Sequence, residues 1–304
     1  MISFVIPVFN EEQGINDNIK KIISFIPCEY EVILVDDGSK DKTWQKIKEL
    51  SNENKNIIGA RFSRNFGKEA ALMAGISIAE GDAVITMDSD LQHPPKFIPD
   101  LINKWNEGYK VVELRKAKRG KESLFYKLSA GAFYGSLKKL SGLDMANSSD
   151  YKLLDRMVVE NIKKFKEGQL FFRGVVDWVG FDKCTMEVEF EEREVGKSKF
   201  NLKSLSRLAI NAITSFSSSL LYITGFIGAV FFIAAIVLGI QTLINKFCGN
   251  SLEGFTTIIL LQLIIGSLIM FCLAIIGLYV GKIYEETKSR PQYIVSEVTK
   301  GDRE

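Results

Sequence analysis

The sequence lacks two glycine patterns by which many proteins bind nucleotide phosphates. No Gly-x-Gly-x-x-Gly follows the first β-prone run, at residues 2–8, which argues against a dinucleotide site. Gly196, Lys197 and Ser198 resemble the end of a P-loop, but Glu191 stands where the leading glycine of that motif is needed. A bound diphosphate would therefore depend on a metal ion and cationic side chains for its charge.

Cysteine, histidine and net charge are also scarce. The four cysteines are scattered and predict neither disulfides nor a zinc site; they are Cys28, Cys184, Cys248 and Cys272. A formal net charge of +2 gives no reason to expect a nucleic-acid partner. The single histidine, His93, precedes Pro94 and Pro95, and we interpret it as structural or as a hydrogen-bond donor rather than as a catalytic base.

Charged residues are absent from two long stretches, 208–245 and 254–281. Each stretch exceeds the roughly 20 residues that a helix needs to cross a bilayer. Because the first stretch begins with polar residues, we expect transmembrane helices at 218–245 and 255–281, joined by an extracytoplasmic loop at 246–254. Their apolar length disfavours the alternative, a buried helical pair in a soluble core.

Basic residues flank these stretches on the sides away from the loop, which predicts that both termini face the cytoplasm. Residues 197–217 combine basic and apolar side chains, as expected of an interfacial amphipathic segment on the inner leaflet, although an ordinary surface helix is the alternative. We therefore expect a multi-pass protein of the cell inner or plasma membrane, with residues 282–304 as a cytoplasmic tail. No cleavable signal peptide is expected before the first β-prone run.

β-prone runs and helical patterns alternate over the first 114 residues. The runs are 2–8, 31–35, 57–60, the start of 83–95, and 110–114. Helical spacing lies between them, as where Ile15, Ile19, Ile22 and Ile26 recur. This order predicts an α/β fold with a mainly parallel sheet, helices on both faces, and chemistry at the carboxyl ends of the strands.

Two aspartates stand at the end of one of these runs, in AVITMDSDLQHPP (83–95). Asp88 and Asp90 are two residues apart and can turn toward one site. Adjacent carboxylates are costly unless a cation offsets them, and a hard divalent metal is the natural occupant. Because solvated turns contain such a tripeptide by chance, its setting must decide.

Four segments in order resemble family 2 glycosyltransferases of the GT-A fold: VIPVFNEE (5–12), VDDGSKD (35–41), RNFGKEAA (64–71) and MDSDLQHPP (87–95). Later segments are similar to the polyprenyl-phosphate branch, which includes dolichyl-phosphate mannose synthase and bacterial undecaprenyl-phosphate glucosyltransferases: NSSDYKLLDR (147–156), FFRGVVDWVGF (171–181), REVGKSKF (193–200) and the tail KSRPQYIV (288–295). The resemblance covers nearly the whole chain. It implies a Rossmann-like GT-A domain at 1–196, followed by the interfacial and transmembrane segments.

The resemblance also implies roles for single residues. It implies Mg²⁺ or Mn²⁺ at Asp88, Asp90 and Gln92, and nucleotide contacts from Pro7, Phe9, Glu11, Asp36, Asp37 and Lys68. Phe9 replaces the tyrosine common there, so a hydroxyl contact is lost. For the diphosphate and the acceptor phosphate it implies Arg115, Lys127, Arg193, Ser198 and Lys199, and beside the reacting centre Asp150, for positioning or proton acceptance.

Simpler interpretations of these residues stay open. Asp36 and Asp37 could form a turn and cap a helix around Gly38 and Ser39. The basic residues at 193–199 could meet anionic headgroups, and Asp150 could form a strand-end salt bridge.

As an activity, the resemblance implies a metal-dependent inverting glycosyltransferase that moves a sugar from a nucleoside diphosphate to polyprenyl phosphate, undecaprenyl phosphate in a bacterium, at the cytoplasmic face. UDP-glucose is the first expected donor and UDP-N-acetylglucosamine the second, with mannose and galactose donors behind. Relatives lead us to expect a homo-oligomer such as a tetramer.

Two other functions fit parts of the sequence. A processive polysaccharide synthase shares the catalytic fold, but its Gln-x-x-Arg-Trp motif is absent, because Gln169, Arg173 and Trp178 are wrongly spaced. Two membrane crossings are also too few for a translocation channel. A non-catalytic membrane scaffold or flippase partner is disfavoured by the intact aspartates.

Overall fold

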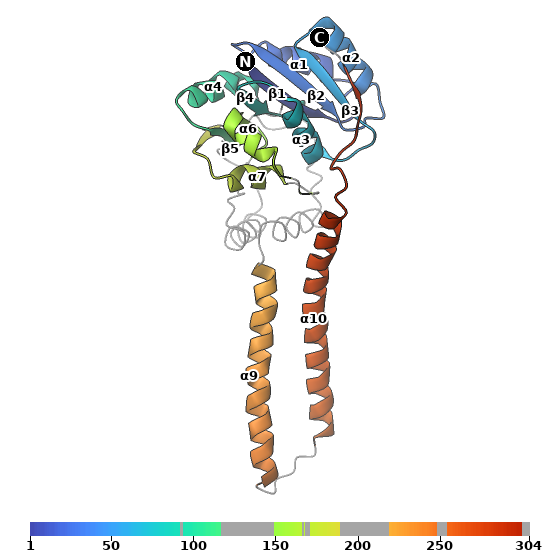
Figure 1. Ribbon diagram of the computed structural model, residues 1–304, viewed down its shortest axis with the longest axis vertical. Helices are drawn as coiled ribbons and strands as arrows, with labels where there is room; N and C mark the ends of the chain where they lie inside the picture. The colour runs from blue at the N-terminus through green and yellow to red at the C-terminus, as the bar shows by residue number, and fades with distance from the viewer. Residues whose placement is uncertain are drawn as a thin grey trace. The chain divides into compact units, whose positions relative to one another are not determined.

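The computed structural model describes residues 1–91, 94–116, 149–165, 167, 171–188, 219–247 and 254–299. The chain divides into two compact units. We call Met1–Lys199 with Arg290–Glu304 the sheet unit, and Phe200–Ser289 the helical unit. Figure 1 shows the elements of both.

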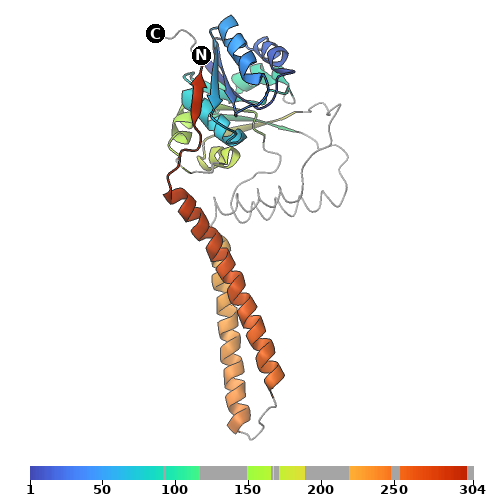
Figure 2. The same ribbon diagram turned by 90° about the vertical axis from the view of Figure 1, so that its right-hand side faces the viewer.

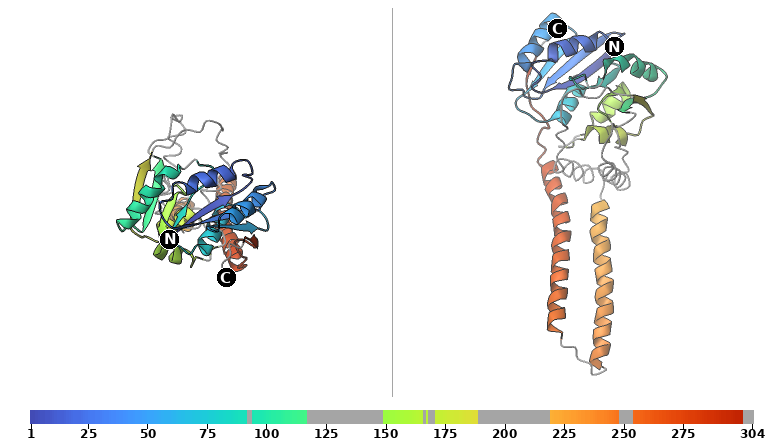
Figure 3. Two further views of the ribbon diagram at one scale, coloured as in Figure 1. Left: turned by 90° about the horizontal axis from the view of Figure 1, so that it is seen from above. Right: turned by 180° about the vertical axis from the view of Figure 1, so that it is seen from behind.

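The sheet unit is built on an eight-stranded sheet in the order β7-β5-β6-β4-β1-β2-β3-β8. Neighbours pair in parallel from β4 through β3 and again between β5 and β7, whereas β6 and β8 run antiparallel to their neighbours. Figure 3 shows the β5–β7 edge in the view from above. The strands are β1 (Ile2–Val8), β2 (Tyr30–Asp36), β3 (Ile57–Phe62), β4 (Ala83–Thr86), β5 (Val111–Lys116), β6 (Lys152–Asp155), β7 (Lys183–Val188) and β8 (Val295–Val298). All five β-prone runs are strands, and the mainly parallel core is confirmed.

Helices cover both faces of this sheet, as predicted. Alternate β1 residues such as Phe4 and Ile6 join one buried cluster with Ile15 and Ile19 of α1, because successive strand residues point to opposite faces. On the other face α3 approaches β1 so closely that a Cβ on Gly75 would lie 2.3 Å from a methyl of Val5. The helices are α1 (Ile15–Ile23), α2 (Thr43–Glu53), α3 (Lys68–Ile78), the 3₁₀ turn η1 (Pro95–Phe97), α4 (Ile98–Asn106), α6 (Arg156–Ile162) and α7 (Phe172–Trp178).

The last strand, β8, comes from the far end of the chain. It pairs antiparallel with β3, with Ala60 opposite Val298 and Arg61 opposite Glu297. Figure 2 shows it in dark red at the edge of the sheet. The sequence predicts a cytoplasmic tail at residues 282–304 and does not predict this strand.

The helical unit contains two long helices, α9 (Ser219–Phe247) and α10 (Phe255–Thr287). Among the described residues, one stretch is long and apolar enough to cross a membrane, Ile264–Thr287, with a mean hydropathy of 2.4. Within α9 the apolar stretch Thr224–Leu238 is shorter. The second predicted crossing is thus supported by length and composition, and the first stays a prediction. The predicted interfacial segment, 197–217, lies outside the described residues.

Candidate active site

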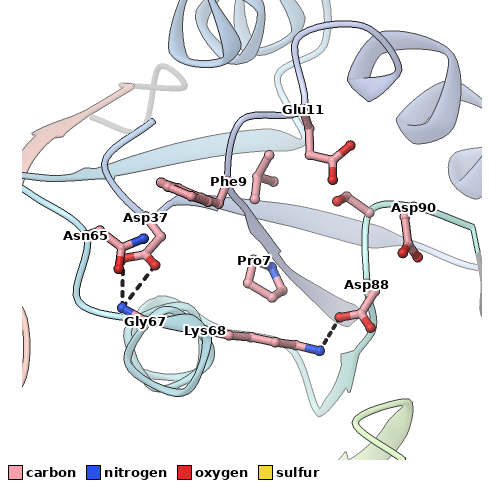
Figure 4. Close-up of a pocket in the computed structure, with 11 residues that line it drawn as sticks. Pro7, Phe9, Glu11, Asp37, Asn65, Gly67, Lys68, Asp88 and Asp90 are labelled. Atoms are coloured by element: carbon pink, nitrogen blue, oxygen red, sulfur yellow. Dashed lines mark hydrogen bonds and ion pairs between the residues drawn. The ribbon is translucent and has the colours of Figure 1, made fainter. Parts of the chain in front are cut away.

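A pocket of about 370 Å³ opens at the carboxyl ends of β1, β2 and β4, the edge where chemistry was expected. Figure 4 shows carboxylates and one lysine converging on it. Seven of the residues proposed from the sequence line it: Pro7, Phe9, Glu11, Asp37, Lys68, Asp88 and Asp90. Val8, Asn65, Gly67 and Ser89 complete the lining.

The aspartate turn after β4 is fixed by its neighbours. β4 pairs with β1 up to Thr86, and the backbone N–H of Met87 donates to the carbonyl of Val5 (3.2 Å). The side-chain amide of Asn18, on α1, donates to the carbonyl of Ser89 (2.8 Å). These contacts hold the turn so that Asp88 and Asp90 face the pocket (Figure 4).

Negative charge accumulates at this end of the pocket. Burial raises the pKa of Glu11, and the charges of Asp90, Asp41 and Asp88 raise it further. A divalent cation would relieve this repulsion, so the donor set fits a hard metal. No group of three or more acidic, histidine or cysteine side chains is arranged for a metal within the described part of the chain. Substrate phosphates and water would have to supply the remaining ligands, as they commonly do for Mg²⁺.

Asp37 holds the loop that forms the opposite wall. Its carboxylate accepts hydrogen bonds from the backbone N–H of Phe66 (2.7 Å) and of Gly67 (2.9 Å). Gly67 has φ of 101°, a conformation that favours glycine. Burial raises the pKa of Asp37 although these donors oppose the shift.

Asp36 is fully buried and is not part of the pocket lining. It accepts a hydrogen bond from the backbone N–H of Ser39 (3.0 Å), and Arg61 Nε lies 3.3 Å from its other oxygen. These contacts match the turn-forming role. A direct contact between Asp36 and the nucleotide stays a prediction.

An ion-pair network, which we call the pocket network, joins Lys68, Asp88, Asp150 and Arg173. Lys68 Nζ lies 2.5 Å from Asp88 Oδ1 and 2.8 Å from Asp150 Oδ2. Arg173, on α7, donates from Nε (2.6 Å) and Nη2 (2.9 Å) to the two oxygens of Asp150. Asp150 therefore bridges a pocket-lining lysine and a guanidinium that does not line the pocket.

The pairing shows a salt bridge, the simpler alternative considered for Asp150, and it bears on whether this residue also positions a group or accepts a proton. Burial alone would raise the pKa of this carboxyl, but Arg173 and Lys68 outweigh it and hold the pKa far below its usual range. Desolvation alone would lower the pKa of Lys68, yet Asp150 and Asp88 raise it overall. Asp150 is thus a permanent anion at neutral pH, which favours positioning over proton acceptance.

Sequence reasoning missed two residues of this region. Arg173 and Glu69 both lie in segments that carry the resemblance, but the sequence assigns neither of them a role in the site. Burial raises the pKa of Glu69 to about 7, helped by the charge of Asp150. Glu69 also accepts a hydrogen bond from the backbone N–H of Phe172 (2.8 Å), which ties α3 to α7.

For the remaining candidate residues, the described part of the structure shows no contact with the pocket. Arg115 lies on β5 beside Glu113, with Nε 3.4 Å from the carboxylate, and does not line the pocket. The other candidates lie outside the described residues: Gln92, Lys127, Arg193, Ser198 and Lys199. Their roles stay predictions.

Known proteins resemble this chain over most of its length. The model of the family described as glycosyl transferase family 2 matches residues 3–163. A prophage bactoprenol glucosyl transferase homolog of Escherichia coli (strain K12) is 38% identical in an alignment 304 positions long, which covers 98% of this chain and 99% of that protein. The bactoprenol glucosyl transferase of Shigella phage SfV is 38% identical, covering 97% of each chain.

A further relative and one solved structure are also similar to this chain. The uncharacterized glycosyltransferase YkcC of Bacillus subtilis (strain 168) is 36% identical, covering 96% of this chain and 92% of that protein. Among solved structures, glucosyl-3-phosphoglycerate synthase from Mycobacterium tuberculosis, in complex with Mn²⁺, UDP and glucosyl-3-phosphoglycerate, is 21% identical. Its TM-score is 0.46, over 70% of this chain and 77% of that one. The family match over residues 3–163, together with relatives aligned along almost their whole length, shows that this chain belongs to glycosyl transferase family 2.

Proposed function

We propose that this protein transfers glucose from a nucleoside diphosphate, UDP first among them, to a polyprenyl phosphate such as undecaprenyl phosphate, with inversion at the anomeric carbon. The observation that carries the proposal is end-to-end identity of 38% with proteins named bactoprenol glucosyl transferase. The pocket at the carboxyl ends of the strands, which is lined by carboxylates and a lysine, supports the proposal.

The residues of the pocket divide the work. Asp88 and Asp90, with Gln92, would hold Mg²⁺ or Mn²⁺, which supplies positive charge for the departing diphosphate. Pro7, Phe9 and Asp37 line the wall on which we place the nucleotide.

On the other side of the pocket, Lys68 places a side-chain cation beside Asp88, where the diphosphate develops charge. Asp150, held as an anion, orients Lys68 and Arg173. The acceptor phosphate is already anionic at neutral pH, so its attack on the anomeric carbon needs no strong base. We place Arg115, Lys127 and the basic segment 193–199 with the phosphates.

The sheet itself supports an even number of membrane crossings. β1 precedes the helical unit and β8 follows it, yet both strands belong to one sheet. An open sheet does not lie within the hydrocarbon layer, so its strands share one side of the membrane. If α10 crosses, a second crossing is required between residues 200 and 289, and α9 is the candidate. By the positive-inside rule, the basic flanks support a cytoplasmic position for the sheet unit. We also propose that the protein forms a homo-oligomer.

The test is a donor panel with the full-length protein in lipid nanodiscs and undecaprenyl phosphate. Labelled UDP-glucose, UDP-N-acetylglucosamine, UDP-galactose and GDP-mannose are compared by the label that enters the extracted lipid. We expect lipid-linked label from UDP-glucose and release of UDP. Label from another donor alone would overturn the sugar assignment, and no lipid-linked label from any donor would overturn the proposed acceptor.

A further inference from the structure

Residues 290–299, which follow α10, return to the sheet unit and cover the edge strand β3. Besides the β3–β8 pairing, the backbone N–H of Ser63 donates to the carbonyl of Ile294 (3.0 Å), and the backbone N–H of Thr299 donates to the carbonyl of Gly59 (2.8 Å). Figure 2 shows the returning strand against the sheet. Two of its side chains begin contact paths that end at Asp36 and Asp37.

The first path is aromatic. The ring of Tyr293 stacks on Phe62 with centroids 5.2 Å apart and an interplanar angle of 14°. Phe62 in turn meets Phe66 edge-on at 5.6 Å. The backbone N–H of Phe66 donates to Asp37 (2.7 Å), so the stack supports the loop that forms one wall of the pocket.

The second path is polar. Glu297 accepts a hydrogen bond from the indole N–H of Trp44 (2.8 Å). The guanidinium of Arg61 lies over the Trp44 ring, 5.9 Å from its centroid. Arg61 then donates to the carbonyl of Ser39 (3.2 Å), and its Nε lies 3.3 Å from Asp36.

We propose that Tyr293 and Glu297 are positioning residues for the donor nucleotide: they fix the Phe66–Gly67 loop and Arg61, which in turn fix Asp37 and Asp36. This inference rests on the proposed nucleotide contacts of Asp37 and of Asp36. A loop held before the ligand arrives loses less conformational freedom on binding, so the strand after the membrane helix raises donor affinity.

The positioning role is tested by measuring UDP binding to the full-length protein by calorimetry and by measuring transfer kinetics. Tyr293→Ala removes the stack and Glu297→Ala removes the acceptor for the indole. We expect each to weaken UDP binding about three- to tenfold, the range that one aromatic pair or hydrogen bond supplies. The donor KM should rise by the same factor, whereas kcat at saturating donor and the KM for undecaprenyl phosphate should stay unchanged.

Conservative variants separate positioning from general loss of structure. Tyr293→Phe keeps the stack and Glu297→Gln keeps a hydrogen-bond acceptor, so both should bind UDP as the wild type does. Val298→Thr alters an exposed β8 side chain and serves as the matched control. If Tyr293→Ala does not fold, Tyr293→Leu, which keeps apolar area but not the stack, replaces it.

Asp37→Asn distinguishes failure of the inference from failure of the proposed function. If Asp37→Asn leaves UDP binding unchanged, the nucleotide site is placed wrongly. If Asp37→Asn weakens binding but the alanine variants at 293 and 297 do not, the positioning role is wrong. The positioning role would also be wrong if the alanine variants lowered both kcat and the thermal unfolding temperature but left the UDP dissociation constant unchanged.

Discussion

Two ion-pair networks lie close together in the sheet unit, and they differ in what they face. The pocket network joins Lys68, Asp88, Asp150 and Arg173, and two of its members line the pocket. The second, which we call the sheet network, joins Glu113, Lys152, Lys183 and Asp177, and Arg115 is a further neighbour of Glu113 at 3.4 Å. Its central pair, Glu113 and Lys152, is opposed across β5 and β6 at 2.7 Å, with both side chains 0% exposed.

Burial and charge alone do not tell these networks apart. Desolvation lowers the pKa of Lys152 to about 8 although Glu113 opposes the shift, so a strongly shifted pKa also occurs away from the pocket. The difference is access: Lys68 and Asp88 can meet a substrate, and Lys152 cannot. We therefore expect changes near the pocket to lower turnover, and changes in the sheet network to lower stability.

The largest effect should come from Asp90→Ala, which removes a pocket carboxylate outside both networks. Loss of charge stabilisation at a departing group typically lowers turnover by about 10²–10³-fold. Transfer to lipid should fall to that extent while the thermal unfolding temperature stays within the range of the wild type. Chelation with EDTA should inactivate the wild type in the same way. Full activity of the variant, or of the wild type in EDTA, would contradict the metal role of this aspartate.

The reverse outcome is expected for Lys152→Met. This change leaves Glu113 buried with fewer cations, and breaking a buried pair from one side costs about 3 kcal/mol or more. Lys183, 2.6 Å from Glu113, offsets part of the loss. Thermal unfolding should show the destabilisation, with turnover per folded molecule unchanged below the transition.

Lys110→Met is the matched control for that experiment. Lys110 pairs with Asp155 at 3.0 Å, but its side chain is 38% exposed. An exposed pair contributes about 0–1 kcal/mol. Equal destabilisation by the two variants would show that burial of the Glu113–Lys152 pair has no special consequence.

Arg173→Lys tests whether the pocket network needs its bidentate geometry. Lysine keeps the charge but cannot donate in parallel to both oxygens of Asp150. We expect turnover to fall about tenfold, the equivalent of one charge-assisted hydrogen bond. Because Arg173 helps to hold the pKa of Asp150 low, its loss raises that pKa. Activity should then be lost at a higher pH on the acid side, and an unchanged acid limb would contradict the positioning role of Asp150.

The two networks also show what the sequence could reveal. Asp88 and Asp90 follow a buried apolar strand, and Asp37 follows another, so strand prediction alone brings them to one edge of the sheet. Arg173 and Asp150 are separated by 23 residues, and Glu69 and Phe172 by 103. No local periodicity encodes such pairs, because they depend on how α3 and α7 pack.

The same reason explains why β8 was not foreseen. It is a four-residue edge strand, and the indole it engages on Trp44 lies 253 residues earlier than Glu297. Its sequence, Val-Ser-Glu-Val, is too short to separate from an extended tail. The central strands were predictable because their apolar runs are longer and are followed by helical spacing.

The last expected effect depends on pH and concerns Glu69, beside the pocket network. Its pKa in the folded protein is about 7, above its ordinary value of 4.5, so the folded state binds the proton more tightly than the unfolded state. Stability should therefore decrease as the pH rises from about 4.5 to about 7, by at most about 1.4 kcal/mol per pH unit. Asp150 has the opposite shift, but its contribution changes only below its ordinary value of 3.8, outside this window.

Glu69→Gln isolates this contribution, because glutamine resembles the protonated acid and can still accept from the backbone N–H of Phe172. Wild type and variant should be equally stable below about pH 4, and the variant should be the more stable at about pH 8. Glu53→Gln, on a side chain 63% exposed, is the control and should follow the wild type across this range. Thermal unfolding at several pH values measures the stability of the wild type and of both variants. Parallel curves for wild type and Glu69→Gln would mean that Glu69 is ionised in the folded state at neutral pH, and that the charges around the pocket network tolerate a further carboxylate.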